Sequence, residues 1–87
     1  MATATMVKKL GGTWTGDARL YRLTPPLDDA AYVVVSATNA MFTGPETYIF
    51  PADASGEVID WLELRGSFRG GLDHAEALSG AGYVIEP

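Results

Sequence analysis

The sequence predicts an α+β domain, with an antiparallel meander sheet of four to five strands and one short C-terminal helix before the last strand. Three observations lead to this fold class. The chain has 87 residues, which is the size of one domain. Turn signals rich in glycine and proline separate short apolar runs, and such runs favour strands. Only after Gly71 does the apolar spacing change to three and four residues, which is typical of a helix.

A single domain is predicted over residues 8–87, preceded by a disordered segment at residues 1–7. Hydrophobic residues make up 47% of the chain and charged residues 20%, a composition typical of globular domains and unlike that of disordered chains. The chain contains no cysteine, so it can form neither a disulfide nor a thiolate metal site. No apolar run reaches the length of a secretory signal or a membrane span, so we expect a cytoplasmic protein that does not bind membranes.

The first two expected strands lie on either side of a proline pair. The alternating segment DARLYRLT, residues 17–24, predicts the first strand, and Pro25 and Pro26 are expected to end it because proline cannot donate to a ladder. The second strand begins near Tyr32. Three consecutive β-branched residues follow, so this strand is expected to be central and buried on both faces: Val33, Val34 and Val35.

Two further strands are expected before the helix. The turn at residues 43–45 reverses the chain into ETYIFPA, the third strand. Residues 53–56, DASG, predict another turn, because aspartate can bond its own backbone and glycine can adopt a positive φ. The fourth strand is EVIDWLEL, residues 57–64, in which Ile59 and Trp61 point to one face.

A short helix is predicted to start at Asp73. Aspartate is a favoured N-cap residue, and Glu76 three places later completes the pattern of a capping box, in which each side chain bonds the backbone amide of the other residue. Gly80 or Gly82 is expected to end the helix in a left-handed conformation. Residues 83–85 then return as a last strand at the edge of the sheet.

His74, the single histidine, stands between two acids and is the residue that most suggests chemistry. Because Asp73 and Glu76 are assigned to helix capping, we interpret His74 as the first helical residue, with its side chain near the surface. No nucleophile or second histidine accompanies it in sequence, so no catalytic residue is predicted and a non-enzymatic protein is favoured. One histidine with scattered carboxylates matches no metal-ligand spacing, and neither a metal nor another cofactor is predicted.

The segment RGSFRGG leaves two interpretations open. Arg65 and Arg69 flank glycines just before a helix, an arrangement that can bind an anion or a nucleotide, with His74 nearby. Alternatively, the segment is a loop whose solvated arginines pair with acidic groups. The second interpretation is favoured, because Asp73 and Glu76 place negative charge where a phosphate would bind.

Nine aromatic residues are many for so small a core. One helix covers only one face of a sheet, so some aromatics are expected either in the core or on an exposed binding face. Tyr21, Tyr48 and Trp61 are the candidates for that face, together with Arg19 or Arg22. Groups of tyrosine, tryptophan and arginine are typical anchors of protein interfaces.

The net charge of −5 is unevenly distributed. Residues 1–44 carry a net charge of +1 and residues 45–87 a net charge of −6. An acidic surface repels phosphate backbones, so nucleic-acid binding is not expected.

The stretch ETYIFPADASGEVIDWLELRGSFRGGLDHAEALSGAGY covers roughly the last half of the chain. Through GPETYIFPAD, residues 56–61, GLDH and GAGY, it resembles a type of small protein found in actinobacteria and their phages, for which no activity is known. The resemblance implies an accessory or mobile-element protein, but no activity and no site residues.

Together these observations predict a small, non-enzymatic accessory protein, linked to phages, that binds a protein partner through an aromatic and acidic surface. An uncovered sheet face and an exposed sheet edge would also favour a homodimer. The alternative is a small pocket for an anionic ligand or nucleotide, or a minor enzyme, built around Arg65, Arg69 and His74.

Overall fold

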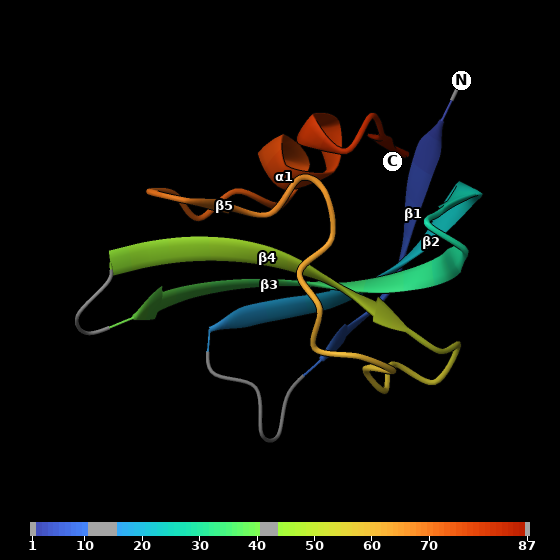
Figure 1. Ribbon diagram of the computed structural model, residues 1–87, viewed down its shortest axis with the longest axis horizontal. Coiled ribbons are helices and arrows are strands. Elements are labelled where there is room, and N and C mark those ends of the chain that lie inside the picture. Colours follow the sequence, from blue (N-terminus) through green and yellow to red (C-terminus); the bar gives the residue numbers. More distant parts are fainter. Residues whose placement is uncertain (1, 11–15, 41–43, 87) are drawn as a thin grey trace.

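The computed structural model describes residues 2–10, 16–40 and 44–86 (Figure 1). The expected turn at residues 43–45 therefore lies partly outside the described residues. The elements follow one another as β1 (Thr3–Leu10), β2 (Asp17–Leu27), β3 (Ala30–Ala40), β4 (Gly44–Ala52), β5 (Phe68–Arg69), α1 (His74–Gly80) and β6 (Val84–Glu86).

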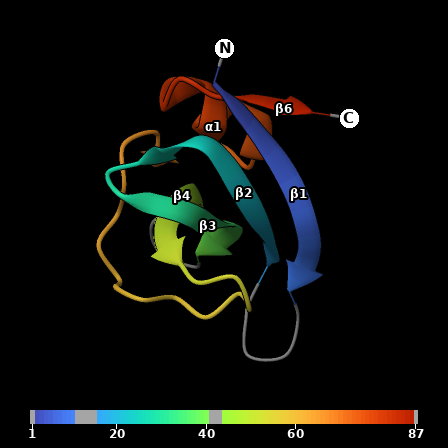
Figure 2. The same ribbon diagram turned by 90° about the vertical axis from the view of Figure 1, so that its right-hand side faces the viewer.

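The strands form one curled, six-stranded sheet in the order β5-β4-β3-β2-β1-β6, and α1 packs over one of its faces (Figures 1 and 2). The α+β class is confirmed. The purely antiparallel meander of four to five strands is wrong, because β6 pairs with β1 in parallel while every other pair is antiparallel. The two strands of the parallel pair are far apart in sequence, and α1 carries the chain from β5 at one edge of the sheet to β6 at the other.

The N-terminal strand β1 contains most of the segment that the sequence suggests is disordered. It pairs with β2, from Thr3 opposite Thr24 to Leu10 opposite Ala18. The register shifts between Met6 and Lys8. Such a bulge interrupts the two-residue alternation by which a strand is recognised, so the sequence gives no clear strand pattern here.

The expected strand at residues 57–64 is also wrong. After β4 the chain makes a single isolated bridge, between Ala52 and Val58. The turn before it is confirmed: Asp53 accepts a hydrogen bond from the amide of Ser55 at 2.9 Å, and Gly56 has a φ of +97°. Residues 59–63 then lie outside the sheet; we call them the 59–63 loop.

The helix begins and ends where the sequence predicts, with half of the expected capping box. The Asp73 side chain accepts a hydrogen bond from the amide of Glu76 at 3.1 Å. The amide of Asp73, however, donates to the hydroxyl of Thr47 and not to Glu76. At the other end Gly82 has a φ of +95°, and its amide and that of Tyr83 bond carbonyls of the last turn. This is a Schellman motif.

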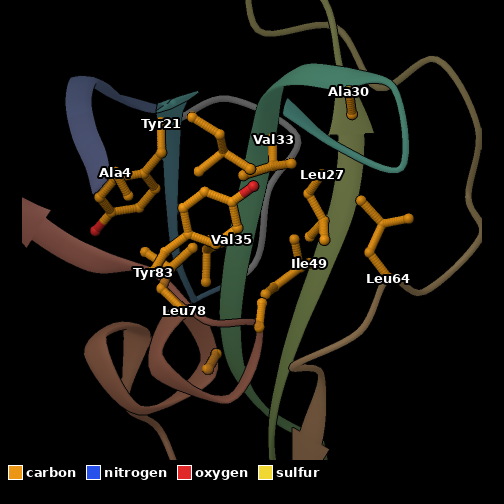
Figure 3. Packing of buried hydrophobic residues seen from close by; sticks show 13 residues of the cluster. Ala4, Tyr21, Leu27, Ala30, Val33, Val35, Ile49, Leu64, Leu78 and Tyr83 are labelled. Atoms are coloured by element: carbon orange, nitrogen blue, oxygen red, sulfur yellow. The ribbon is translucent and has the colours of Figure 1, made fainter. Parts of the chain in front are cut away.

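The core lies mainly between the sheet and α1 (Figure 3). Its larger members are Tyr21, Leu23, Leu27, Val33, Val35, Ile49, Leu64, Leu78 and Tyr83. The opposite face carries a second, smaller cluster that includes Leu20 and Val34, against which Leu10 and Val58 pack. Val33, Val34 and Val35 are all fully buried, so the prediction of a central strand covered on both faces is confirmed.

Candidate binding surface

The 59–63 loop exposes three large apolar side chains. Ile59 is 69% exposed, Trp61 66% and Leu62 64%. Asp60 and Glu63, which are also exposed, give the same loop a negative charge. Single exposed apolar residues are common, but a group of this kind within five consecutive residues is a feature of interaction sites.

Hydrogen bonds and one buried side chain fix both ends of this loop. The amide of Ile59 donates to the carbonyl of Pro51 at 2.9 Å, and the amide of Leu64 donates to the carbonyl of Ile49 at 2.8 Å. Leu64 is itself part of the core. The Ser67 hydroxyl accepts from the amide of Ile49 and donates to the carbonyl of Leu64, each at 2.8 Å. Both ends of the loop are therefore held against β4, and the residues between them project from it.

A row of aromatic rings connects the loop to the sheet. Tyr48 and Phe50 are two residues apart on β4, so they share a face. Their ring centroids are 5.9 Å apart, and the ring of Trp61 meets that of Phe50 edge to face at 5.2 Å. Edge-to-face pairs at this distance are favourable. We call Tyr48, Phe50, Ile59, Trp61 and Leu62 the aromatic surface.

Polar groups hold the Tyr48 end of the aromatic surface in place. Arg69 Nε donates to the Tyr48 hydroxyl at 3.1 Å, and that hydroxyl donates to the carboxylate of Glu46. The hydrogen bond to Glu46 raises the pKa of Tyr48, and Arg69 acts in the opposite direction. The phenol is therefore neutral, and its hydrogen bonds with the Glu46 carboxylate and the Arg69 guanidinium fix its orientation.

An open pocket of about 570 Å³ adjoins this end of the aromatic surface. It is lined by Tyr48, Glu63, Leu64, Arg65, Gly66, Ser67, Phe68 and Arg69. Gly66 has a φ of +105°, and a Cβ atom there would lie 2.3 Å from the carbonyl oxygen of Ala77 in α1. Only glycine allows the pocket wall to approach the helix so closely. The two arginines of the RGSFRGG segment therefore border one depression, which His74 does not line.

His74 is buried, with 7% of its side chain exposed, so its predicted surface position is wrong. Its Nε2 lies 2.9 Å from the backbone oxygen of Asp17, and its Nδ1 lies 3.4 Å from the hydroxyl of Tyr21. Burial is the main reason that the pKa of His74 lies below its usual value, although Asp17 and Asp73 act against that shift. Both ring nitrogens bond groups of the protein itself. The sequence could not show this contact, because Asp17 lies 57 residues away.

Tyr21 is buried as well, so its predicted place beside Tyr48 and Trp61 is wrong. It is 1% exposed, and its ring centroid lies 6.1 Å from that of His74 on the helix side of the sheet. Strand alternation turns Tyr21 toward the helix, and burial raises the pKa of its hydroxyl.

The structure thus divides the six candidate residues into two groups. Tyr48, Trp61, Arg65 and Arg69 belong to the aromatic surface and the pocket beside it, whereas Tyr21 and His74 form a separate buried pair. The sequence interpretation missed Phe50, Ile59 and Leu62. Their apolar character was visible, but on short strands periodicity cannot separate a core face from an exposed one.

Comparison of the chain with protein-family models, curated proteins and solved structures finds no match. The resemblance to small proteins of actinobacteria and their phages stays a prediction. Within residues 2–10, 16–40 and 44–86, the helix α1 is much too short to span a bilayer, and no longer helix is present. No group of three or more metal-ligating side chains is found in the same residues.

Proposed function

We propose that the protein is a non-enzymatic accessory protein that binds another protein through the aromatic surface. The observation that carries this proposal is the exposure of Ile59, Trp61 and Leu62, each about two-thirds exposed, on a loop with fixed ends. Complete burial of a side chain such as leucine or isoleucine contributes about 1.5–3 kcal/mol. Because the loop ends are already ordered, little of that gain is lost to ordering the loop on binding.

Charge defines the chemistry of the partner. The 59–63 loop carries Asp60 and Glu63, and Glu57 precedes it; all three side chains are exposed. A partner with an apolar centre and a basic rim would match this surface, and opposite charges speed association and exclude acidic competitors. The same charges disfavour nucleic acid.

The bonding of both His74 nitrogens within the protein supports a role without catalysis. The link to phages rests on the sequence resemblance alone.

Photo-crosslinking in the producing cells tests the proposal. A photoreactive residue is placed at Ile59, and a matched control carries it at Leu72, which is 52% exposed and lies outside the aromatic surface. We expect one defined adduct from position 59, absent from position 72 and lost when Trp61→Ser is added. Equal adducts at both positions, or none at position 59, would contradict the proposal.

The second candidate function is anion binding in the pocket beside Tyr48. It is favoured by one observation: Arg65 and Arg69 line the same depression. Thermal-shift measurements with inorganic phosphate and with nucleotides test it. Saturable stabilisation that disappears in Arg69→Ala, but persists in a control Arg22→Ala variant, would support this function. A flat response in the unmodified protein would exclude it.

A further inference from the structure

We infer that the partner of the aromatic surface is a second copy of this chain, bound head to tail. The 59–63 loop of one copy docks along the open edge of β1 of the next copy. This inference rests on the proposed function and names its partner. Four features of the described residues carry it: an open sheet edge, a strand-forming sequence left outside the sheet, opposite charges, and the positions of the two surfaces.

The open edge is the part of β1 beyond residue 5. β6 pairs with β1 only at residues 3–5, so within the described part of the chain no strand lies on the outer side of residues 6–10. Met6 and Val7 are 44% and 47% exposed there. Unpaired edges of this kind are templates for the addition of a further strand.

The 59–63 loop has the composition of the missing strand. Residues 57–64, EVIDWLEL, contain the β-branched and aromatic residues that strands favour, yet residues 59–63 lie outside the sheet. A segment with strand preference that is held in place by its ends is suited to adding to an edge. Strand addition would also place Ile59 and Trp61, two residues apart, on one side of the new strand.

Charge distinguishes a head-to-tail contact from a symmetric one. The open edge carries Lys8 and Lys9, which are exposed, and the loop carries Asp60 and Glu63. Edge-to-loop docking brings these opposite charges together. A two-fold contact between two loops would instead oppose acids with acids, which is destabilising.

The two surfaces lie on different sides of the molecule. In Figure 2 the golden-orange segment that contains the 59–63 loop follows the left side, whereas β1 forms the right side. Each copy therefore offers a loop to one neighbour and an edge to another. Such a heterologous contact builds a ring if its rotation closes and an open filament if it does not.

Mixing of two variants tests this arrangement by sedimentation velocity. Trp61→Glu is designed to prevent docking by the loop, and the double variant Val7→Asp with Lys9→Glu to prevent docking on the edge. All three positions are exposed, and circular dichroism verifies that each variant is folded. We expect the unmodified protein to form oligomers larger than dimers and each variant alone to be monomeric. The equimolar mixture should form a heterodimer and nothing larger, because it retains one working edge and one working loop.

Charge exchange provides the second arm. Asp60→Lys with Glu63→Lys, and Lys8→Glu with Lys9→Glu, should each abolish self-association, because loop and edge then carry the same charge. An equimolar mixture of the two variants should form oligomers again, because every loop then meets an edge of opposite charge. A mixture that stays monomeric overturns the head-to-tail contact, and so does an unmodified protein that is monomeric at its highest soluble concentration. If that monomer still crosslinks to a different protein from position 59, only the identity of the partner is wrong. If it crosslinks to nothing, the proposed function fails as well.

Discussion

His74 Nε2 lies 2.9 Å from the backbone carbonyl oxygen of Asp17, so the first residue of α1 is bonded to the first residue of β2. Because a carbonyl only accepts, Nε2 carries the ring proton, and Nδ1 accepts from the hydroxyl of Tyr21. The imidazole thus ties the helix to the sheet. Both nitrogens of the buried imidazole therefore have hydrogen-bond partners within the protein itself.

The buried histidine makes the stability of the protein depend on pH. Its pKa in the folded state lies below the value of 6.5 that applies to the unfolded chain, mainly because of burial. The unfolded chain therefore takes up the proton first as the pH falls. The contribution to stability is complete above about pH 6.5 and is lost as the pH falls toward the folded-state pKa.

We therefore expect the free energy of unfolding, measured with urea, to decrease as the pH falls below about 6.5. His74→Gln removes the titrating group and should flatten this dependence. An equally steep decrease in the variant would show that other groups cause it.

Thr47 should be important for stability although it is neither charged nor large. It is fully buried, its hydroxyl donates to the carbonyl of Gly71 at 2.8 Å, and the same oxygen accepts from the amide of Asp73 at 3.2 Å. Thr47→Val leaves both backbone groups without that partner and should cost about 1–3 kcal/mol in urea unfolding. Thr38→Val on the neighbouring strand, which is only partly buried, is the control and should change little.

Two glycines allow the steric cost of a Cβ atom to be separated from its backbone cost. Gly66 and Gly70 have nearly the same φ, +105° and +103°. A Cβ at Gly66 would lie 2.3 Å from the Ala77 carbonyl oxygen, whereas nothing lies within 4 Å of one at Gly70. Gly70→Ala should therefore cost about 1–2 kcal/mol, the penalty for a left-handed alanine. Gly66→Ala should cost clearly more, and equal losses in thermal unfolding would contradict the close approach to α1.

The helix cap yields a paired prediction. Asp73→Ala removes the acceptor of the Glu76 amide and should destabilise the protein by about 1 kcal/mol. Glu76→Ala should have a smaller effect, because the Asp73 amide donates to Thr47 and not to the Glu76 side chain. Chemical unfolding of both variants measures the difference. Equal losses would indicate a complete capping box.

Local chemistry made part of this fold predictable. Three adjacent valines required a doubly covered strand, and Asp53 and Asp73 bond the nearby amides that their side chains can reach. Strand β1 was missed because the bulge near Met6 breaks the alternation. EVIDWLEL was mistaken for a strand because its strand preference is outweighed by the anchoring of its two ends against β4.

The candidate site was less predictable than the fold. Tyr48 and Trp61 were identified from residue type, as amphipathic aromatics that suit interfaces. The same rule wrongly included Tyr21, because only the position of α1 decides which side of β2 is covered. The environment of His74 depends on a contact across 57 residues, which local patterns do not contain.

Because the hydrogen bonds at both ends of the 59–63 loop hold it in place, its exposed side chains can change independently of the core. The bonds of Leu64, Ile49 and Ser67 involve backbone groups and the Ser67 hydroxyl, so substitutions at positions 60, 62 and 63 should alter recognition at little cost to folding. Selection can therefore retune specificity here one substitution at a time. For the same reason, a foreign peptide of equal length grafted between the anchors would be displayed on an intact scaffold.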